Sequence, residues 1–136
     1  VIRVLEENEV ELICLAGFMR VLSKDFVASF PHKIINIHPS LLPAFPGLQV
    51  QKKAIEYGVR HTGCTVHFVV PEVDAGPIIL QAVVPIEQGD TAETLAARIL
   101  EKEHLVYPKA VKLFAQGRLS IEGRRVLISE EGKDNA

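Results

Sequence analysis

The sequence predicts an α/β fold, with a mostly parallel sheet flanked by helices, in one domain over residues 1–136. Two observations indicate this class. Dense apolar runs of strand length, such as residues 10–17 (VELICLAG), are typical of parallel strands that are buried on both faces. Segments with helical spacing and helix-capping residues lie between these runs. Strands that alternate with helices in this way form a sheet covered by helices.

The first half of the chain contains strands and short helices in turn. Residues 1–9 have helical spacing without a preceding capping residue, which we interpret as the end of a helix that begins earlier in a longer chain. Ser23 is the expected N-cap of a helix over 23–30, and residues 33–39 (KIINIHP) form the next buried strand. Three prolines and a glycine in 39–47 (PSLLPAFPG) predict a loop.

The second half contains the longest predicted helix. Gly58 is expected to close a helix over 48–57 in the left-handed conformation. Asp90 is the expected N-cap of a helix that runs to about residue 116, with Glu93 completing a capping box. The other expected elements are strands at 62–70 and 78–86, a tight connection at 71–77, a hairpin at 118–128 that turns at Glu122–Gly123, and a polar tail over about 130–136.

Composition and charge argue against several classes of protein. The 15 basic and 17 acidic residues give a net charge of −2 without a basic cluster, which disfavours a nucleic-acid-binding protein. No apolar run approaches the roughly 20 residues of a membrane-spanning helix, and the N-terminal residues do not resemble a signal peptide. Cys14 and Cys64 lie in apolar, strand-like runs, so we expect two reduced core cysteines in a cytoplasmic protein.

Asn36 and His38 form the strongest candidate site. They are two positions apart on a predicted strand, so their side chains point to the same face. Ligands of α/β sheets bind beyond the carboxyl ends of the strands, and Pro39 ends this strand directly after His38. An amide beside an imidazole at such a position can stabilise a carbonyl oxygen as it gains negative charge. The alternative is a structural histidine whose ring is tied into the loop.

Asp74 is the second candidate, on the turn VDAGP between two predicted strands. Its carboxylate can pair with His38, orient the ring and support its charged form. The alternative is a turn aspartate that binds its own backbone, which is common. The sequence alone does not place Asp74 beside His38, because the two residues lie far apart along the chain.

His61, Cys64 and His67 resemble a set of metal ligands, but strand geometry argues against a metal site. Cys64 and His67 face opposite sides of a strand, and His61 and His67 lie roughly 20 Å apart along it. We therefore expect no bound metal, and we expect His67 to form a hydrogen bond within the sheet or to support the site. Arg20 is a candidate ligand of a phosphate or carboxylate, and Glu103 lies in mid-helix; a solvated surface position is the alternative for both.

The segment NIHPSLLPAFPG (36–47) closely resembles the folate-dependent phosphoribosylglycinamide formyltransferases of purine biosynthesis. The resemblance implies a Rossmann-like formyltransferase fold that lacks its N-terminal strand–helix units here, roughly 60–70 residues that include a Gly-rich phosphate-binding turn. We therefore expect these 136 residues alone to be inactive or nearly so. The resemblance covers about residues 3–120 and continues, in order, through GCTVHFV (63–69), DAGPIILQ (74–81), GDT (89–91), Glu103–His104 and Tyr107–Pro108.

The resemblance also implies a reaction and a role for each matching residue. The family transfers a formyl group from 10-formyltetrahydrofolate, its co-substrate, to the amine of glycinamide ribonucleotide, without a metal. Asn36, His38 and Asp74 match the catalytic trio. The amide and the protonated imidazole would stabilise the oxyanion of a tetrahedral intermediate, and the carboxylate would hold the imidazole and help to move a proton through water. Residues that match the folate cleft are Met19, Arg20, Leu22, Val27, Ile34, Val70, Pro71, Glu72 and Val73; Gly47 and Glu103 match the nucleotide site.

The chain departs from the family at Gln49 and Gln51, where many members carry histidines that can titrate. Three alternatives remain. Formyltetrahydrofolate hydrolases use a similar Asn, His and Asp with water as the acceptor. A methionyl-tRNA formyltransferase is disfavoured, because Ala44–Phe45 stands where that family has an Arg-rich loop and the chain is acidic. The non-catalytic alternative is a fragment that binds folate without turnover, whose unpaired sheet edge would favour association, including a homodimer.

Overall fold

The computed structural model describes residues 2–16 and 23–130 of the 136-residue chain. Met19, Arg20 and Leu22, and nearly all of the predicted polar tail, therefore lie outside the described residues. The elements are α1 (Ile2–Glu7), β1 (Ile13–Ala16), α2 (Lys24–Ser29), β2 (Ile34–His38), α3 (Val50–Tyr57), β3 (His61–Phe68), β4 (Ile78–Pro85), α4 (Ala92–Ala115), β5 (Leu119–Glu122) and β6 (Arg125–Ile128).

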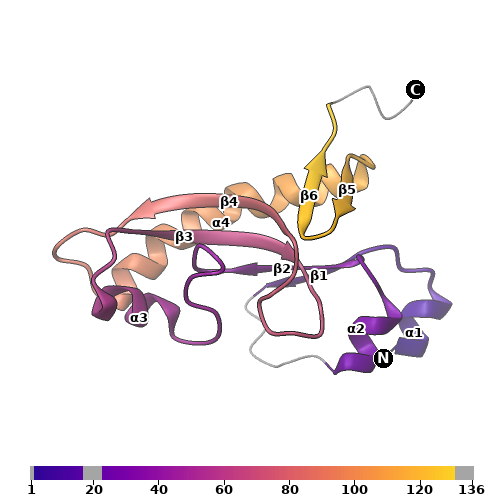
Figure 1. Cartoon of the computed structure of the whole chain (residues 1–136), viewed down its shortest axis with the longest axis horizontal. Helices are drawn as coiled ribbons and strands as arrows, with labels where there is room; N and C mark the ends of the chain where they lie inside the picture. The colour runs from indigo at the N-terminus through magenta and orange to yellow at the C-terminus, as the bar shows by residue number, and fades with distance from the viewer. Residues whose placement is uncertain (1, 17–22, 131–136) are drawn as a thin grey trace.

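The strands form one six-stranded sheet in the order β1-β2-β3-β4-β6-β5 (Figure 1). The predicted α/β fold with flanking helices is confirmed. The strand directions are mixed rather than mostly parallel, because only the β1–β2 and β4–β6 pairs are parallel. The connection between Phe68 and Ile78 is too short for a crossover, so it joins β3 and β4 as an antiparallel pair.

Local capping signals place several element ends as expected. The Ser23 hydroxyl accepts a hydrogen bond from the Phe26 amide at 3.1 Å and caps α2. Gly58 ends α3 with a φ of 89°, a left-handed conformation that glycine adopts without strain. The predicted hairpin is confirmed as β5 and β6, which turn at Gly123.

The start of α4 corrects one prediction. Thr91, not Asp90, is the N-cap, and Thr94 rather than Glu93 completes the capping box with its hydroxyl. The Asp90 carboxylate instead accepts two hydrogen bonds from Arg98, which hold the pKa of Asp90 well below its usual range. The helix therefore begins one residue later than the sequence pattern suggested.

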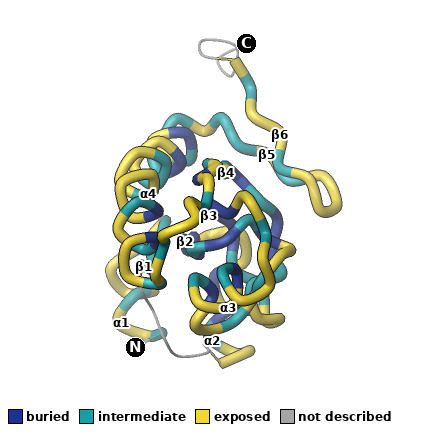
Figure 2. The backbone as a smooth tube through the Cα atoms, turned by 90° about the vertical axis from the view of Figure 1, so that its left-hand side faces the viewer, coloured by how far each residue is buried: buried dark blue, intermediate teal, exposed yellow. Residues whose placement is uncertain are grey.

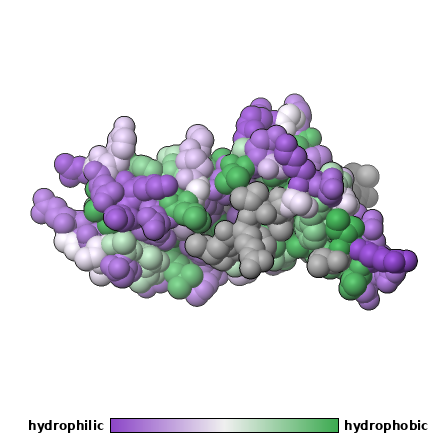
Figure 3. All heavy atoms as spheres, turned by 90° about the horizontal axis from the view of Figure 1, so that it is seen from below, coloured by the Kyte–Doolittle hydropathy of each residue, from purple (hydrophilic) through white to green (hydrophobic). Residues whose placement is uncertain are grey.

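Helix α4 covers one face of the sheet (Figures 1 and 2). Its buried residues are Leu95, Ile99, Ala110 and Leu113. The opposite face carries a second apolar cluster against α1 and α2, with Val27, Phe30 and Ile34 at its centre. Hydrophobic side chains also reach the surface at the end that carries α1 and α2 (Figure 3). The buried residues of the cluster under α4 are Ile35, Ile37, Cys64, Val66, Phe68, Ile79, Val84, Leu95, Ile99 and Ala110.

The two cysteines differ in their surroundings. Cys64 is fully buried under α4, as expected, and burial is the main cause that raises the pKa of its thiol to about 11. Cys14 is exposed on β1, so the prediction of a core position is wrong. Within the described ranges β1 pairs with β2 alone, which leaves its outer edge open. None of the helices within those ranges combines the length and hydrophobicity that crossing a membrane requires.

Candidate active site

Four polar side chains lie on the face of β2 and β3 that points away from α4. Side chains alternate along a strand, so Asn36 and His38 face opposite to Ile35 and Ile37, which pack under α4. The antiparallel register places Asn36 beside His67 and His38 beside Thr65. This polar group lies at the carboxyl end of β2, where the sequence predicted a site.

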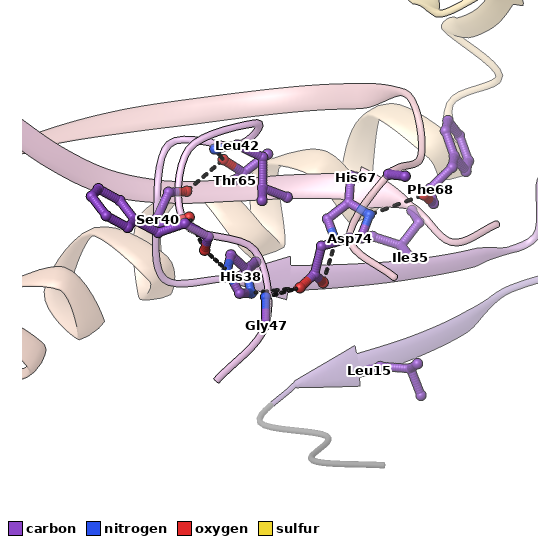
Figure 4. Close-up of polar contacts among 12 residues, drawn as sticks. Leu15, Ile35, His38, Ser40, Leu42, Gly47, Thr65, His67, Phe68 and Asp74 are labelled. Atoms are coloured by element: carbon purple, nitrogen blue, oxygen red, sulfur yellow. Dashed lines mark hydrogen bonds and ion pairs between the residues drawn. The ribbon is translucent and has the colours of Figure 1, made fainter. Parts of the chain in front are cut away.

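His38 lies between two oxygen acceptors (Figure 4). Its Nε2 atom is 2.8 Å from the Phe45 carbonyl oxygen, and its Nδ1 atom is 3.5 Å from Asp74 Oδ2. The ring is only 5% exposed. Both ring nitrogens of His38 therefore face oxygen atoms that can accept a hydrogen bond.

Asp74 approaches His38 from the connection between β3 and β4, residues 69–77, here called the Asp74 loop. The backbone of Asp74 has a φ of 50°, which is uncommon for a residue other than glycine. The Gly47 amide donates a hydrogen bond of 2.8 Å to Asp74 Oδ2, so one carboxylate oxygen faces both the amide and the imidazole (Figure 4). The loop thus brings together residues that the sequence could not place.

His67 lies beside Asp74 but does not form a hydrogen bond with its carboxylate. Its Nδ1 atom is 3.0 Å from the Phe68 carbonyl oxygen, and its Nε2 atom lies 3.9 Å from Asp74 Oδ1, too far for a hydrogen bond. Burial lowers the pKa of His67, and the Phe68 carbonyl and Asp74 only partly oppose that effect. A neutral His67 that donates from Nδ1 leaves a lone pair on Nε2, which explains its distance from the carboxylate.

Two buried polar atoms of this group have no hydrogen-bond partner among the described residues: Asn36 Oδ1 and His67 Nε2. Buried polar groups are almost always paired, so unpaired atoms indicate a place for water or a ligand. Because the two ends of an amide exchange on a flip of the side chain, Asn36 can present a donor as well as an acceptor to that place.

A second network fixes the segment that follows His38, residues 39–49, here called the His38 loop. The Thr65 hydroxyl donates to the Ser40 carbonyl at 2.7 Å and accepts from the Leu42 amide at 3.1 Å. Gln81 on β4 donates to Thr65 Oγ1 and to the Leu42 carbonyl, both at 3.0 Å. The sequence predicted no role for Thr65 and Gln81, although their place on neighbouring strands was a usable signal.

The other residues that were matched to the family differ in burial and in their distance along the chain from the polar group. Val27 and Ile34 are buried in the cluster against α2, next to the polar group along β2. Val70 is half-buried, and Pro71, Glu72 and Val73 are exposed on the Asp74 loop. Glu103 lies on α4, the helix that covers the opposite face, and the structure does not bring it to His38. Partial burial raises the pKa of Glu103.

Comparison with known proteins identifies the family. The sequence pattern described as Formyl transferase matches residues 1–111. The chain belongs to the formyl transferase family. Trifunctional purine biosynthetic protein adenosine-3 of Gallus gallus is 59% identical over 119 residues, which are 88% of this formyl transferase chain and 12% of the relative. Phosphoribosylglycinamide formyltransferase of Escherichia coli is 47% identical over 111 residues, 82% of the chain and 52% of the relative. The chain thus spans about half the length of that bacterial formyl transferase.

Solved structures support the same family. Glycinamide ribonucleotide transformylase 1 from Symbiobacterium toebii has a TM-score of 0.92 and 57% sequence identity. The match covers 95% of this chain and 61% of the transformylase chain. A formyltetrahydrofolate deformylase from Pseudomonas syringae has a TM-score of 0.89 and 29% sequence identity. The match covers 94% of this chain and 43% of the deformylase chain. No group of three or more His, Cys, Asp or Glu residues in the described parts of the chain could hold a metal ion.

Proposed function

We propose that this chain carries the catalytic face of an enzyme that transfers the formyl group of 10-formyltetrahydrofolate to the amine of glycinamide ribonucleotide. The observation that carries the proposal is the position of His38 between the Phe45 carbonyl and Asp74, beside Asn36, whose Oδ1 atom has no partner among the described residues. The names of two relatives, phosphoribosylglycinamide formyltransferase and glycinamide ribonucleotide transformylase 1, support it.

In the proposed reaction the substrate amine attacks the formyl carbon and a tetrahedral intermediate forms, with negative charge on the formyl oxygen. Because both nitrogens of His38 already face acceptors, its part is to supply a nearby positive charge. Asn36 donates the hydrogen bond to the oxyanion. Asp74 orients His38 and, through a water molecule, accepts the proton that the amine loses and passes it to the folate nitrogen. The bond between that nitrogen and the formyl carbon breaks as the intermediate collapses, which releases tetrahydrofolate.

The two substrates are assigned to separate regions of the site. We assign the folate to the Asp74 loop and to the apolar residues next to it, Val27 and Ile34. We assign the nucleotide to Gly47 and to Glu103. Both cysteines are free thiols, which agrees with a cytoplasmic enzyme.

The test is turnover of 10-formyltetrahydrofolate by the full-length protein, with and without glycinamide ribonucleotide. We expect tetrahydrofolate release to require the nucleotide and an isotope-labelled formyl carbon to appear on its amine. Replacement of Asn36 by Asp, which cannot donate, is expected to lower kcat by about 10²- to 10³-fold. Formate release without the nucleotide would instead identify a deformylase, and folate binding without turnover, unaffected by His38→Ala, would identify a non-catalytic binding protein.

A further inference from the structure

The Asp74 loop is held at its ends and across the site. The Phe68 amide donates to the Pro77 carbonyl at 2.9 Å, which closes the base of the loop. Gly76 packs so tightly that a Cβ atom there would lie 1.6 Å from the Phe68 carbonyl oxygen. Between these contacts the chain passes through the left-handed conformation of Asp74, so the tip of the loop needs support from other parts of the structure.

One further contact reaches the loop from the β5–β6 hairpin. Arg124, beside Gly123 in the hairpin turn, donates a hydrogen bond from Nη2 to the Ala75 carbonyl oxygen at 2.8 Å. The next residue, Arg125, pairs with Ile78 at the start of β4, so the tip of the hairpin lies where the Asp74 loop ends (Figure 1). The guanidinium therefore binds the residue that directly follows Asp74.

The hairpin itself is anchored firmly enough to hold the loop. Arg118 and Ser129 exchange two hydrogen bonds across its open end, of 2.7 and 2.9 Å. Leu119, Ile121 and Val126 pack against the apolar cluster under α4. Because the hairpin is held in place, a hydrogen bond from it restrains the loop more than one from a mobile segment would.

The pairing of β4 with β6 holds the hairpin beside the loop at Ile78, four residues after Asp74. A partly open pocket of about 350 Å³ is lined by Phe68, which precedes the loop, and by Leu119 and Ile121 on β5. The hydrogen bond from Arg124 acts closer to the carboxylate, because it ends on Ala75, the residue next to Asp74. We propose that Arg124 is a positioning residue, which holds the Asp74 loop so that the carboxylate stays at His38; this inference rests on the proposed function.

The first test compares three variants of the full-length protein in the formyl-transfer assay. Arg124→Ala is expected to lower kcat about 3- to 10-fold, with the KM for glycinamide ribonucleotide unchanged, because loss of one hydrogen bond lets the carboxylate drift. Arg124→Lys, which keeps a donor, is expected to retain most of the activity. Arg125→Ala removes the same charge one residue further on and is expected to leave kcat within twofold of the wild type. Equal losses in Arg124→Ala and Arg125→Ala, or a wild-type kcat in Arg124→Ala, would overturn the inference.

The second test does not depend on activity. Amide hydrogen exchange of the peptide that spans 69–77 is expected to become faster in Arg124→Ala and to stay unchanged in Arg125→Ala. Faster exchange in a protein that transfers no formyl group would leave the positioning contact intact and refute only the proposed function. Exchange at the wild-type rate in Arg124→Ala would refute the inference itself.

Discussion

The two faces of β2 and β3 carry different kinds of side chain, although both faces are buried to a similar extent. Val66, under α4, has no exposed surface, and His67, on the other face, is only 2% exposed. The partners differ instead: Val66 packs among apolar side chains, whereas His67 lies near polar groups of the loops. Two of the three buried polar atoms without a partner among the described residues, Asn36 Oδ1 and His67 Nε2, lie on the polar face.

The polar face differs from the core face in that some of its buried polar atoms have no partner among the described residues. Side chains on a core face need only pack against one another, and their contribution is to the free energy of unfolding. A site face keeps buried atoms unpaired, which costs stability and leaves them ready for a ligand. Substitutions on the two faces are therefore expected to separate activity from stability.

The largest effect is expected on the polar face. His38→Ala removes the imidazole next to Asn36, so kcat for formyl transfer is expected to fall by about 10²- to 10⁴-fold. The measurement is steady-state kinetics with both substrates, together with a thermal unfolding curve. A kcat within tenfold of the wild type would show that the charge of His38 does not serve the reaction.

On the face under α4, a substitution is expected to lower stability and to leave kcat nearly unchanged. Leu95 is fully buried there, and Leu95→Ala should lower the free energy of unfolding by about 2–5 kcal/mol because it leaves a cavity. Denaturant unfolding measures this loss, and kcat per folded molecule should stay within about threefold of the wild type because Leu95 does not touch the polar group. A loss of kcat as large as that of His38→Ala would contradict the separation of the two faces.

A smaller effect is expected from the pH dependence of stability. Burial lowers the pKa of His67 below its ordinary value of 6.5, so in mildly acidic solution the unfolded chain binds a proton that the folded chain does not. The free energy of unfolding should therefore fall as the pH drops below 6.5, by at most about 1.4 kcal/mol per pH unit from this group. Above that pH His67 contributes no such change.

The control for this prediction is an exposed histidine on the same strand. His67→Gln is expected to flatten the acid side of the stability profile, whereas His61→Gln, at the exposed start of β3, is expected to leave the slope unchanged. The measurement is denaturant unfolding between about pH 5 and 8. A slope that persists in His67→Gln would assign it to other groups.

Much of the fold was predictable because its signals are local. A hydroxyl at Ser23, a glycine at Gly58 and the turn at Gly123 act within a few residues, and each lies where the pattern placed it. The start of α4 was misplaced by one residue because Asp90 and Thr91 are both good N-caps. In the structure the Asp90 carboxylate accepts hydrogen bonds from the Glu87 amide and from Arg98, and Thr91 caps the helix.

The sequence by itself determined that Asn36 and His38 share a face at the end of a strand, since alternation is a property of the extended backbone. It could not determine that Asp74 and the Gly47 amide meet at His38. Those contacts depend on the order and direction of strands far apart along the chain, and on loops whose shape follows from that order. The tertiary structure decided them because the antiparallel return of β3 and the left-handed turn at Asp74 bring the two loops over the same strand end.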